Sequence, residues 1–121
     1  MALRPIDTDS DYCLQGNINL GKLAKSASVP ANVIVDGFQV YNSNAAARFV
    51  CVLEGGSLPP DGTVPLFTLD AAAQSPVGMS FTPNGRFCEN GLTLALSTTD
   101  TTLTAAAADG LFDIQVRWPE D

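Results

Sequence analysis

Residues 111–118 read Leu-Phe-Asp-Ile-Gln-Val-Arg-Trp, and this stretch decides the fold class. Apolar side chains occupy every second position, and polar or charged ones stand between them, from Asp113 to Arg117. Because successive side chains of a β-strand point to opposite faces, this alternation predicts a strand with one buried and one exposed face. The residues expected on the buried face are Phe112, Ile114, Val116 and Trp118.

The same alternation recurs earlier in the chain. Leu92–Ser97 places leucines at every second position. Arg48–Leu53 is apolar on both faces, which is typical of a central strand. Val33–Tyr41 alternates too, but Gly37 in its middle suggests a β-bulge that resets the pattern. These stretches predict a protein built from short strands.

Turn residues separate the strands. Further strands are expected at Asn17–Ser28, Pro65–Leu69, Val77–Phe81 and Arg86–Cys88. Gly, Pro and Asn predict turns at Val29–Asn32, Asn42–Asn44, Asn84–Gly85 and Asn90–Gly91, of which the last two are interpreted as hairpin turns. Gly55–Gly62 is the longest expected loop, and Asp70–Gln74 is long enough for one helical turn.

The fold class follows from seven or eight short strands at close spacing. No segment holds ten or more residues with helical periodicity. We therefore predict an all-β domain over residues 17–121, an antiparallel β-sandwich or jelly-roll-like fold. Residues 1–16 are expected to form an N-terminal arm.

The arm is acidic and has little to bury. Its aspartates alternate with Thr and Ser, a spacing similar to the start of a calcium loop. Such a loop needs glycine at its sixth position and glutamate at its twelfth, where this chain has Tyr12 and Ile18. A segment of this kind stays disordered or is ordered by a partner. The candidate partner contacts are Asp7, Asp9, Asp11, Tyr12 and Trp118, although Trp118 fits core packing as well.

Composition excludes several function classes. The 121 residues carry a net charge of −7, which disfavours nucleic-acid binding and anionic membrane surfaces. Only 16% of the residues are charged, so part of the surface is expected to be covered by neighbouring subunits. The first residues have no apolar stretch typical of a signal peptide, and no run is long enough for a membrane span.

The residue types needed for catalysis are also missing. The chain has no histidine, so a Ser-His-Asp or Cys-His arrangement cannot form within it. The carboxylates at strand ends show no pattern that places two at a catalytic separation; they are Asp36, Glu54, Asp70 and Glu89. We expect no enzymatic activity, no cofactor and no metal.

The cysteines are odd in number and widely spaced. Cys13, Cys51 and Cys88 contain no CxxC pair. Three free thiols are favoured, and a Cys13–Cys88 disulfide is the alternative. Burial in an apolar strand would raise the pKa of Cys51 and reduce its reactivity.

One stretch carries more than a general β pattern. Asn84–Thr99, with its Asn-Gly pairs, Phe87 and alternating leucines, resembles a segment of small virion proteins of tailed bacteriophages. Phe38–Asn44 followed by Phe49–Leu53 is similar to their paired strands around an Asn-rich turn. The resemblance extends over residues 17–118.

The resemblance implies a non-enzymatic structural protein of a virus particle. The favoured form is a head decoration or cement protein, often trimeric, that binds the major capsid protein and bridges capsid subunits. Such a protein is made in the host cytoplasm and ends in the virion. The alternatives are a tail, neck or fibre-base component, and a carbohydrate or host-surface module using Trp118, Tyr41 and Gly55–Gly62. A remote alternative is an enzyme with composite sites between subunits.

Overall fold

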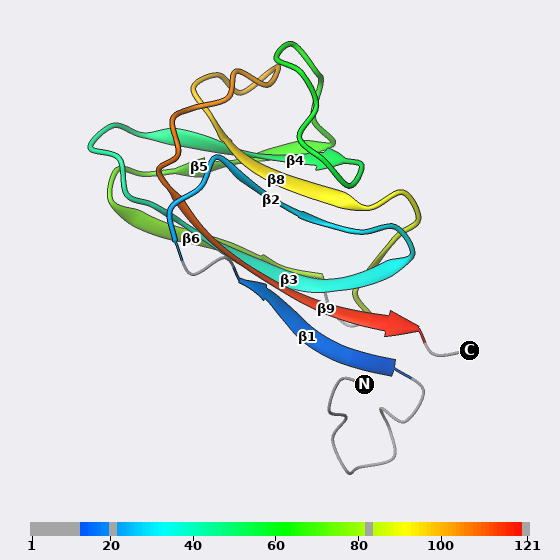
Figure 1. Cartoon of the computed structure of the whole chain (residues 1–121). Coiled ribbons are helices and arrows are strands. Elements are labelled where there is room, and N and C mark those ends of the chain that lie inside the picture. The colour runs from blue at the N-terminus through cyan, green and yellow to red at the C-terminus, as the bar shows by residue number, and fades with distance from the viewer. Residues whose placement is uncertain (1–12, 20–21, 82–83, 120–121) are drawn as a thin grey trace.

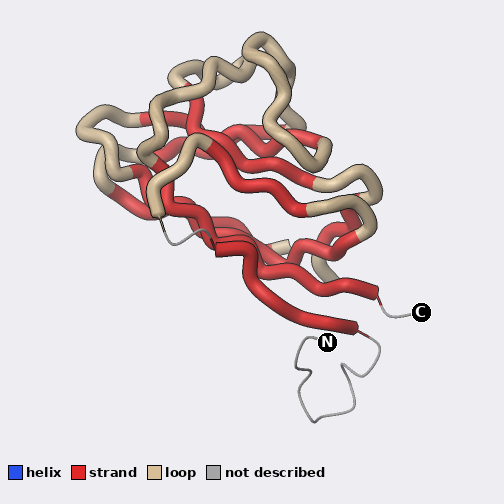
Figure 2. The backbone as a smooth tube through the Cα atoms, in the orientation of Figure 1, coloured by secondary structure: helices blue, strands red, loops and turns tan. Residues whose placement is uncertain are grey.

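The structure, a computed structural model, describes residues 13–19, 22–81 and 84–119. In these residues the chain forms nine strands and no helix (Figures 1 and 2). The strands are β1 (Cys13–Asn19), β2 (Ser26–Val29), β3 (Val33–Asn42), β4 (Arg48–Glu54), β5 (Phe67–Ala71), β6 (Ser75–Ser80), β7 (Arg86–Cys88), β8 (Leu92–Ser97) and β9 (Gly110–Pro119). The prediction of an all-β fold is confirmed. No helix that could span a membrane occurs in this described part.

The strands form two antiparallel sheets packed face to face (Figure 1). Sheet A has the order β1-β9-β3-β6, and β7 also pairs with β3. Sheet B has the order β2-β8-β4-β5. The pairings nest: β1 pairs with β9, β2 with β8, β3 with β6 and β7, and β4 with β5. Nested antiparallel strands divided between two sheets in this way form a jelly roll.

The core lies between the sheets, where their inward faces meet. On β9, Phe112, Ile114 and Val116 are at most 2% exposed, as the alternation predicts. Trp118 continues this face and is half-buried against the same core. From β8 the core takes Leu92, Leu94 and Leu96. Burial of these apolar side chains is the main stabilising contribution to the fold.

Strand β4 is central, as predicted, because β8 and β5 flank it. Val50 and Val52 point into the main core. Cys51 and Leu53 point the other way and join Leu103 in a second buried cluster. The loops that follow β4 and β8 lie over this outer side of sheet B (Figure 1). Sheet B is therefore covered on both faces around its central strands.

The predicted bulge in β3 is confirmed. The pairing of β3 with β9 shifts between Val35 and Gly37. The buried positions shift accordingly, from Val33 and Val35 to Phe38 and Val40. A Cβ atom on Gly37 would lie 2.8 Å from the Met79 carbonyl oxygen, so the close approach of β6 requires glycine there.

The Asn42–Asn44 turn forms as expected. Asn42 is fully buried. Its Nδ2 donates to the carbonyl oxygens of Ala46, Ala71 and Ala72 at 3.0–3.2 Å, and its Oδ1 accepts from Asn44 N at 3.0 Å. One side chain thus ties the β3–β4 turn to the end of β5.

The prediction of one strand over Asn17–Ser28 is wrong. The chain forms β1 and β2 there, and these strands lie in different sheets. A local alternation cannot reveal a crossing between layers, because both strands keep the same period. β1 also begins at Cys13, so residues 13–16, assigned to the arm, lie in this strand. Residues 1–12 lie outside the described part of the chain.

The two expected hairpins are also wrong. Asn84–Gly85 connects β6 and β7, which both pair with β3 and run in the same direction. Asn90–Gly91 connects β7 in sheet A to β8 in sheet B. Gly85 and Gly91 do adopt positive φ, 77° and 91°. Glycine allows the sharp turn. Whether the two flanking strands form a hairpin depends on which other strands each of them pairs with.

The helical turn considered for Asp70–Gln74 does not form. Strand β5 continues through Asp70 to Ala71, because Arg48 and Phe49 of β4 extend the ladder that far. The short strand expected at Pro65–Leu69 starts later, at Phe67, and lies at the edge of sheet B. The strand number exceeds the predicted seven or eight because residues 17–28, where one strand was expected, belong to two strands, β1 and β2.

Candidate functional site

The structure does not bring the predicted partner contacts together. Asp7, Asp9, Asp11 and Tyr12 lie outside the described residues. Trp118 is half-buried and packs against the core, which agrees with the core-packing role that its strand position also allowed. Whether these residues contact a partner stays a prediction.

The three features that the sequence suggested for a carbohydrate module, Trp118, Tyr41 and the loop Gly55–Gly62, do not lie together. Tyr41 pairs with Leu111 at one end of β9, whereas Trp118 lies near the other end, roughly 23 Å along the strand. The loop at 55–62 follows β4 of the opposite sheet. Of these three features, only Tyr41 faces solvent on sheet A.

The four carboxylates considered for catalysis are dispersed. Asp36 belongs to an ion pair: Arg117 Nε donates to its two oxygens at 3.0 and 2.8 Å, and the Arg117 guanidinium also donates to the Asn84 carbonyl oxygen at 2.8 Å. This contact holds the β3 bulge, β9 and the β6–β7 connection together. Asp70 is exposed on the edge strand β5.

Glu54 and Glu89 are the two carboxylates that share a depression, one of about 210 Å³ near β7. Glu54 accepts a hydrogen bond from Asn90 Nδ2 at 2.8 Å, and both carboxylates are exposed. The described residues contain no group of three or more His, Cys, Asp or Glu that could hold a metal ion.

Cys51 and Cys88 are buried thiols. Burial raises the pKa of Cys51, as predicted, although a hydrogen bond with Ser97 acts in the opposite direction. Burial also raises the pKa of Cys88, against the lowering effect of nearby Arg86. Cys13 and Cys88 lie on strands separated by β9 and β3, about 14 Å apart. The Cys13–Cys88 disulfide is therefore wrong, because bridged Cα atoms lie within about 7 Å.

The main candidate surface is the outer face of sheet A. Three cross-strand rows of β6, β3 and β9 point away from the core there, because their neighbours along each strand point inward. We call this surface the sheet A groove. Its rows are Ser80–Gly37–Gln115, Gly78–Gln39–Asp113 and Pro76–Tyr41–Leu111.

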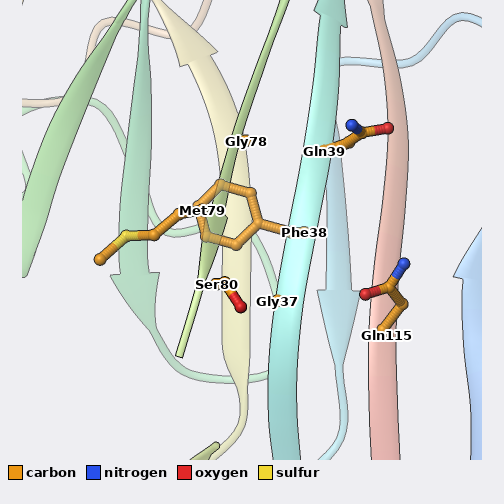
Figure 3. Close-up of a pocket in the computed structure, with 7 residues that line it drawn as sticks. All are labelled: Gly37, Phe38, Gln39, Gly78, Met79, Ser80 and Gln115. Atoms are coloured by element: carbon orange, nitrogen blue, oxygen red, sulfur yellow. The ribbon is translucent and has the colours of Figure 1, made fainter. Parts of the chain in front are cut away.

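The groove consists of two neighbouring depressions that share Gln39. The first, of about 520 Å³, lies over Gly37 and Gly78. The second, of about 300 Å³, lies beside Tyr41. Neither glycine has a side chain to fill the first depression. Figure 3 shows the Gln39 and Gln115 amides on the β9 side of β3.

The polar groups of the groove are not used within the protein. In the described part of the chain, the side chains of Gln39, Gln115 and Tyr41 make no hydrogen bond. Asp113, which lines the second depression, has a buried Oδ1 without a partner among the described residues. Asp113 is also the only charged residue in the three rows.

Sequence reasoning missed this surface. The alternation of Leu111–Trp118 does assign Asp113 and Gln115 to the outer face. It does not show that Gln39 lies beside them, because this depends on the β3–β9 register. The useful signal was Gly37, since a glycine within a strand marks a bulge or a close backbone approach.

Comparisons with known proteins identify no family. No family model and no curated protein matches the sequence. One solved structure, the coat protein of Tobacco streak virus, matches with a TM-score of 0.45 and 8% sequence identity. The match covers 97% of this chain and 93% of that chain.

Proposed function

We propose that this protein is a non-enzymatic structural component of a virus particle, and that it binds the capsid as a decoration or cement protein. The observation that carries the proposal is the nested strand pairing, from β1·β9 inward to β4·β5. This jelly roll is a fold that viral capsid proteins use repeatedly. The resemblance to small virion proteins of tailed bacteriophages supports the same role.

The surface composition also supports a subunit role. Only 16% of the residues are charged, and large apolar side chains remain exposed outside the groove. Val64 is 73% exposed and Leu66 42% exposed, both in the loop between β4 and β5. Contacts with neighbouring subunits would cover such side chains.

The proposed mechanism is stabilisation by binding. A protein that binds the assembled shell, and not its separated subunits, stabilises the shell by its own binding free energy. Many symmetric copies, with trimers as the favoured unit, would add avidity. The acidic arm would become ordered on the major capsid protein.

The first test is copy number in purified particles, measured by quantitative mass spectrometry. Hundreds of copies per particle are expected for a decoration protein. A ring of about six to twelve copies would instead indicate a tail or neck component. Absence from the particle would contradict a virion role altogether.

The second test is shell stability. Particles lacking the protein are heated with and without added purified protein, and release of the genome is followed by dye fluorescence. We expect the added protein to raise the release temperature in a saturable manner. An unchanged release temperature despite bound protein would contradict the cement mechanism.

A further inference from the structure

We infer that the sheet A groove binds a neutral oligosaccharide, a function beyond the structural role proposed above. The inference starts from the chemistry of the three rows. They combine an apolar platform at one end with unused amides and a carboxylate along the rest.

The apolar platform is the row Pro76–Tyr41–Leu111. Tyr41 is 36% exposed and Leu111 41% exposed, and Pro76 flanks Tyr41 on the other side. A pyranose ring has a face of C–H groups that packs on such a surface. Tyrosine suits this contact because its ring is apolar and its hydroxyl reaches water.

The polar groups match sugar hydroxyls. A hydroxyl both donates and accepts a hydrogen bond, and a primary amide does the same. Gln39 and Gln115 offer two such amides, unbonded within the described residues. Asp113, which lines the second depression, adds a carboxylate, and a carboxylate accepts hydrogen bonds from hydroxyl groups.

The shape favours a chain of sugars. Three rows along a strand span about 14 Å, more than a single sugar ring needs. Gln39 lines both depressions, so they are neighbours on this face. Gly37 and Gly78 add no side chains of their own to the first depression, and the side chains of Gln115 and Gln39 lie beside them.

Charge selects a neutral ligand. The rows contain no Lys or Arg, and Asp113 would repel an anion. A protein partner fits the face less well, since a standard interface buries about 800 Å² per partner around an apolar core. Here the middle of the face is Gly78, Gln39 and Asp113, and the apolar row lies at one end.

The test uses the full-length, ¹⁵N-labelled protein. Neutral hexasaccharides of cellulose, starch, chitin and mannan type are titrated separately, and a glycan array extends the search to other neutral chains. For at least one of these ligands we expect saturable shifts of backbone amide signals, centred on Gln39, Tyr41 and Asp113. No saturable binding to any of them, or shifts centred elsewhere, would overturn the inference.

Variants then locate the contact. Tyr41→Ala and Gln39→Ala are each expected to weaken binding about tenfold. Tyr41→Phe is expected to keep most of it, because the ring remains. The matched control is Phe87→Ala, which removes an aromatic side chain that is 56% exposed on β7, outside the groove.

The same variants distinguish a loss of glycan binding from a loss of folding and from a loss of protein binding. Unchanged unfolding midpoints of the variants show that any loss of binding is local. Equal loss in Phe87→Ala would contradict the assignment to the groove. If no glycan binds and Tyr41→Ala instead detaches the protein from particles, the face is a protein contact and the inference is wrong.

Discussion

The side chain of Asn42 makes four hydrogen bonds to backbone groups. It is fully buried and bonds three carbonyl oxygens and one backbone N–H. Asn42→Ala should lower the free energy of unfolding by about 3 kcal/mol, because the buried carbonyls lose their donor. Urea denaturation measures this. Asn90→Ala, which removes an exposed amide bonded to Glu54, is the control and should change stability by less than about 0.5 kcal/mol. Equal effects of the two variants would contradict the assigned role.

The two buried thiols predict a pH dependence. Burial raises the pKa of Cys51 and Cys88 in the folded state, so the unfolded chain loses these protons at lower pH than the folded protein. The stabilising effect is complete below the ordinary thiol pKa of about 8.5 and is lost as pH rises through the folded-state values. Between about pH 8 and pH 10, the unfolding free energy should fall more in the wild type than in a Cys51→Ala/Cys88→Ala variant. If the unfolding free energies of the wild type and the variant change in parallel with pH, the thiols do not contribute to the pH dependence of stability.

At the scale of elements, the loop after β8 is part of the folded core. Its Leu103 is fully buried against the outer face of sheet B, and its backbone bonds Gly62 and Thr63 of the loop after β4. Leu103→Ala should cost about 3 kcal/mol and expose both loops to limited proteolysis. Leu66→Ala is the matched control, because that leucine is 42% exposed, and it should cost less than about 1 kcal/mol. Unaltered protease resistance in Leu103→Ala would contradict the anchoring role.

The elements that sequence predicted well are those with a local signal. The alternation in β8 and β9, the two apolar faces of β4 and the bulge at Gly37 all follow from side-chain period and backbone freedom. Asn90–Gly91 shows the limit. Its local conformation was predicted, but its crossing between sheets is set by Leu92, which pairs with β2 and β4. The groove escaped prediction for the same reason, since Gln39 and Asp113 become neighbours only through the β3–β9 register.

For the whole molecule, the nested pairing makes the chain's first and last strands neighbours. β1 pairs with β9 from Cys13↔Pro119 to Asn19↔Asp113 and forms the edge of sheet A. The arm expected to bind a partner is therefore shortened to residues 1–12, because residues 13–16 already belong to the sheet. A deletion experiment must end before Cys13 to test the arm without damaging the fold.

Deletion of residues 1–12 should leave the domain folded but weaken its binding to particles. The segment is polar and acidic, with Asp7, Asp9 and Asp11 among Ser and Thr, so it has little to contribute to a core. Deletion of residues 1–19 is the contrasting variant. It removes β1, turns β9 into an edge strand with the side that faced β1 unpaired, and should lower stability and promote aggregation. Circular dichroism and urea denaturation measure folding, and cosedimentation with particles that lack the protein measures binding. If the shorter deletion binds as tightly as the full chain, the contact with the particle lies on the jelly roll and not on the arm.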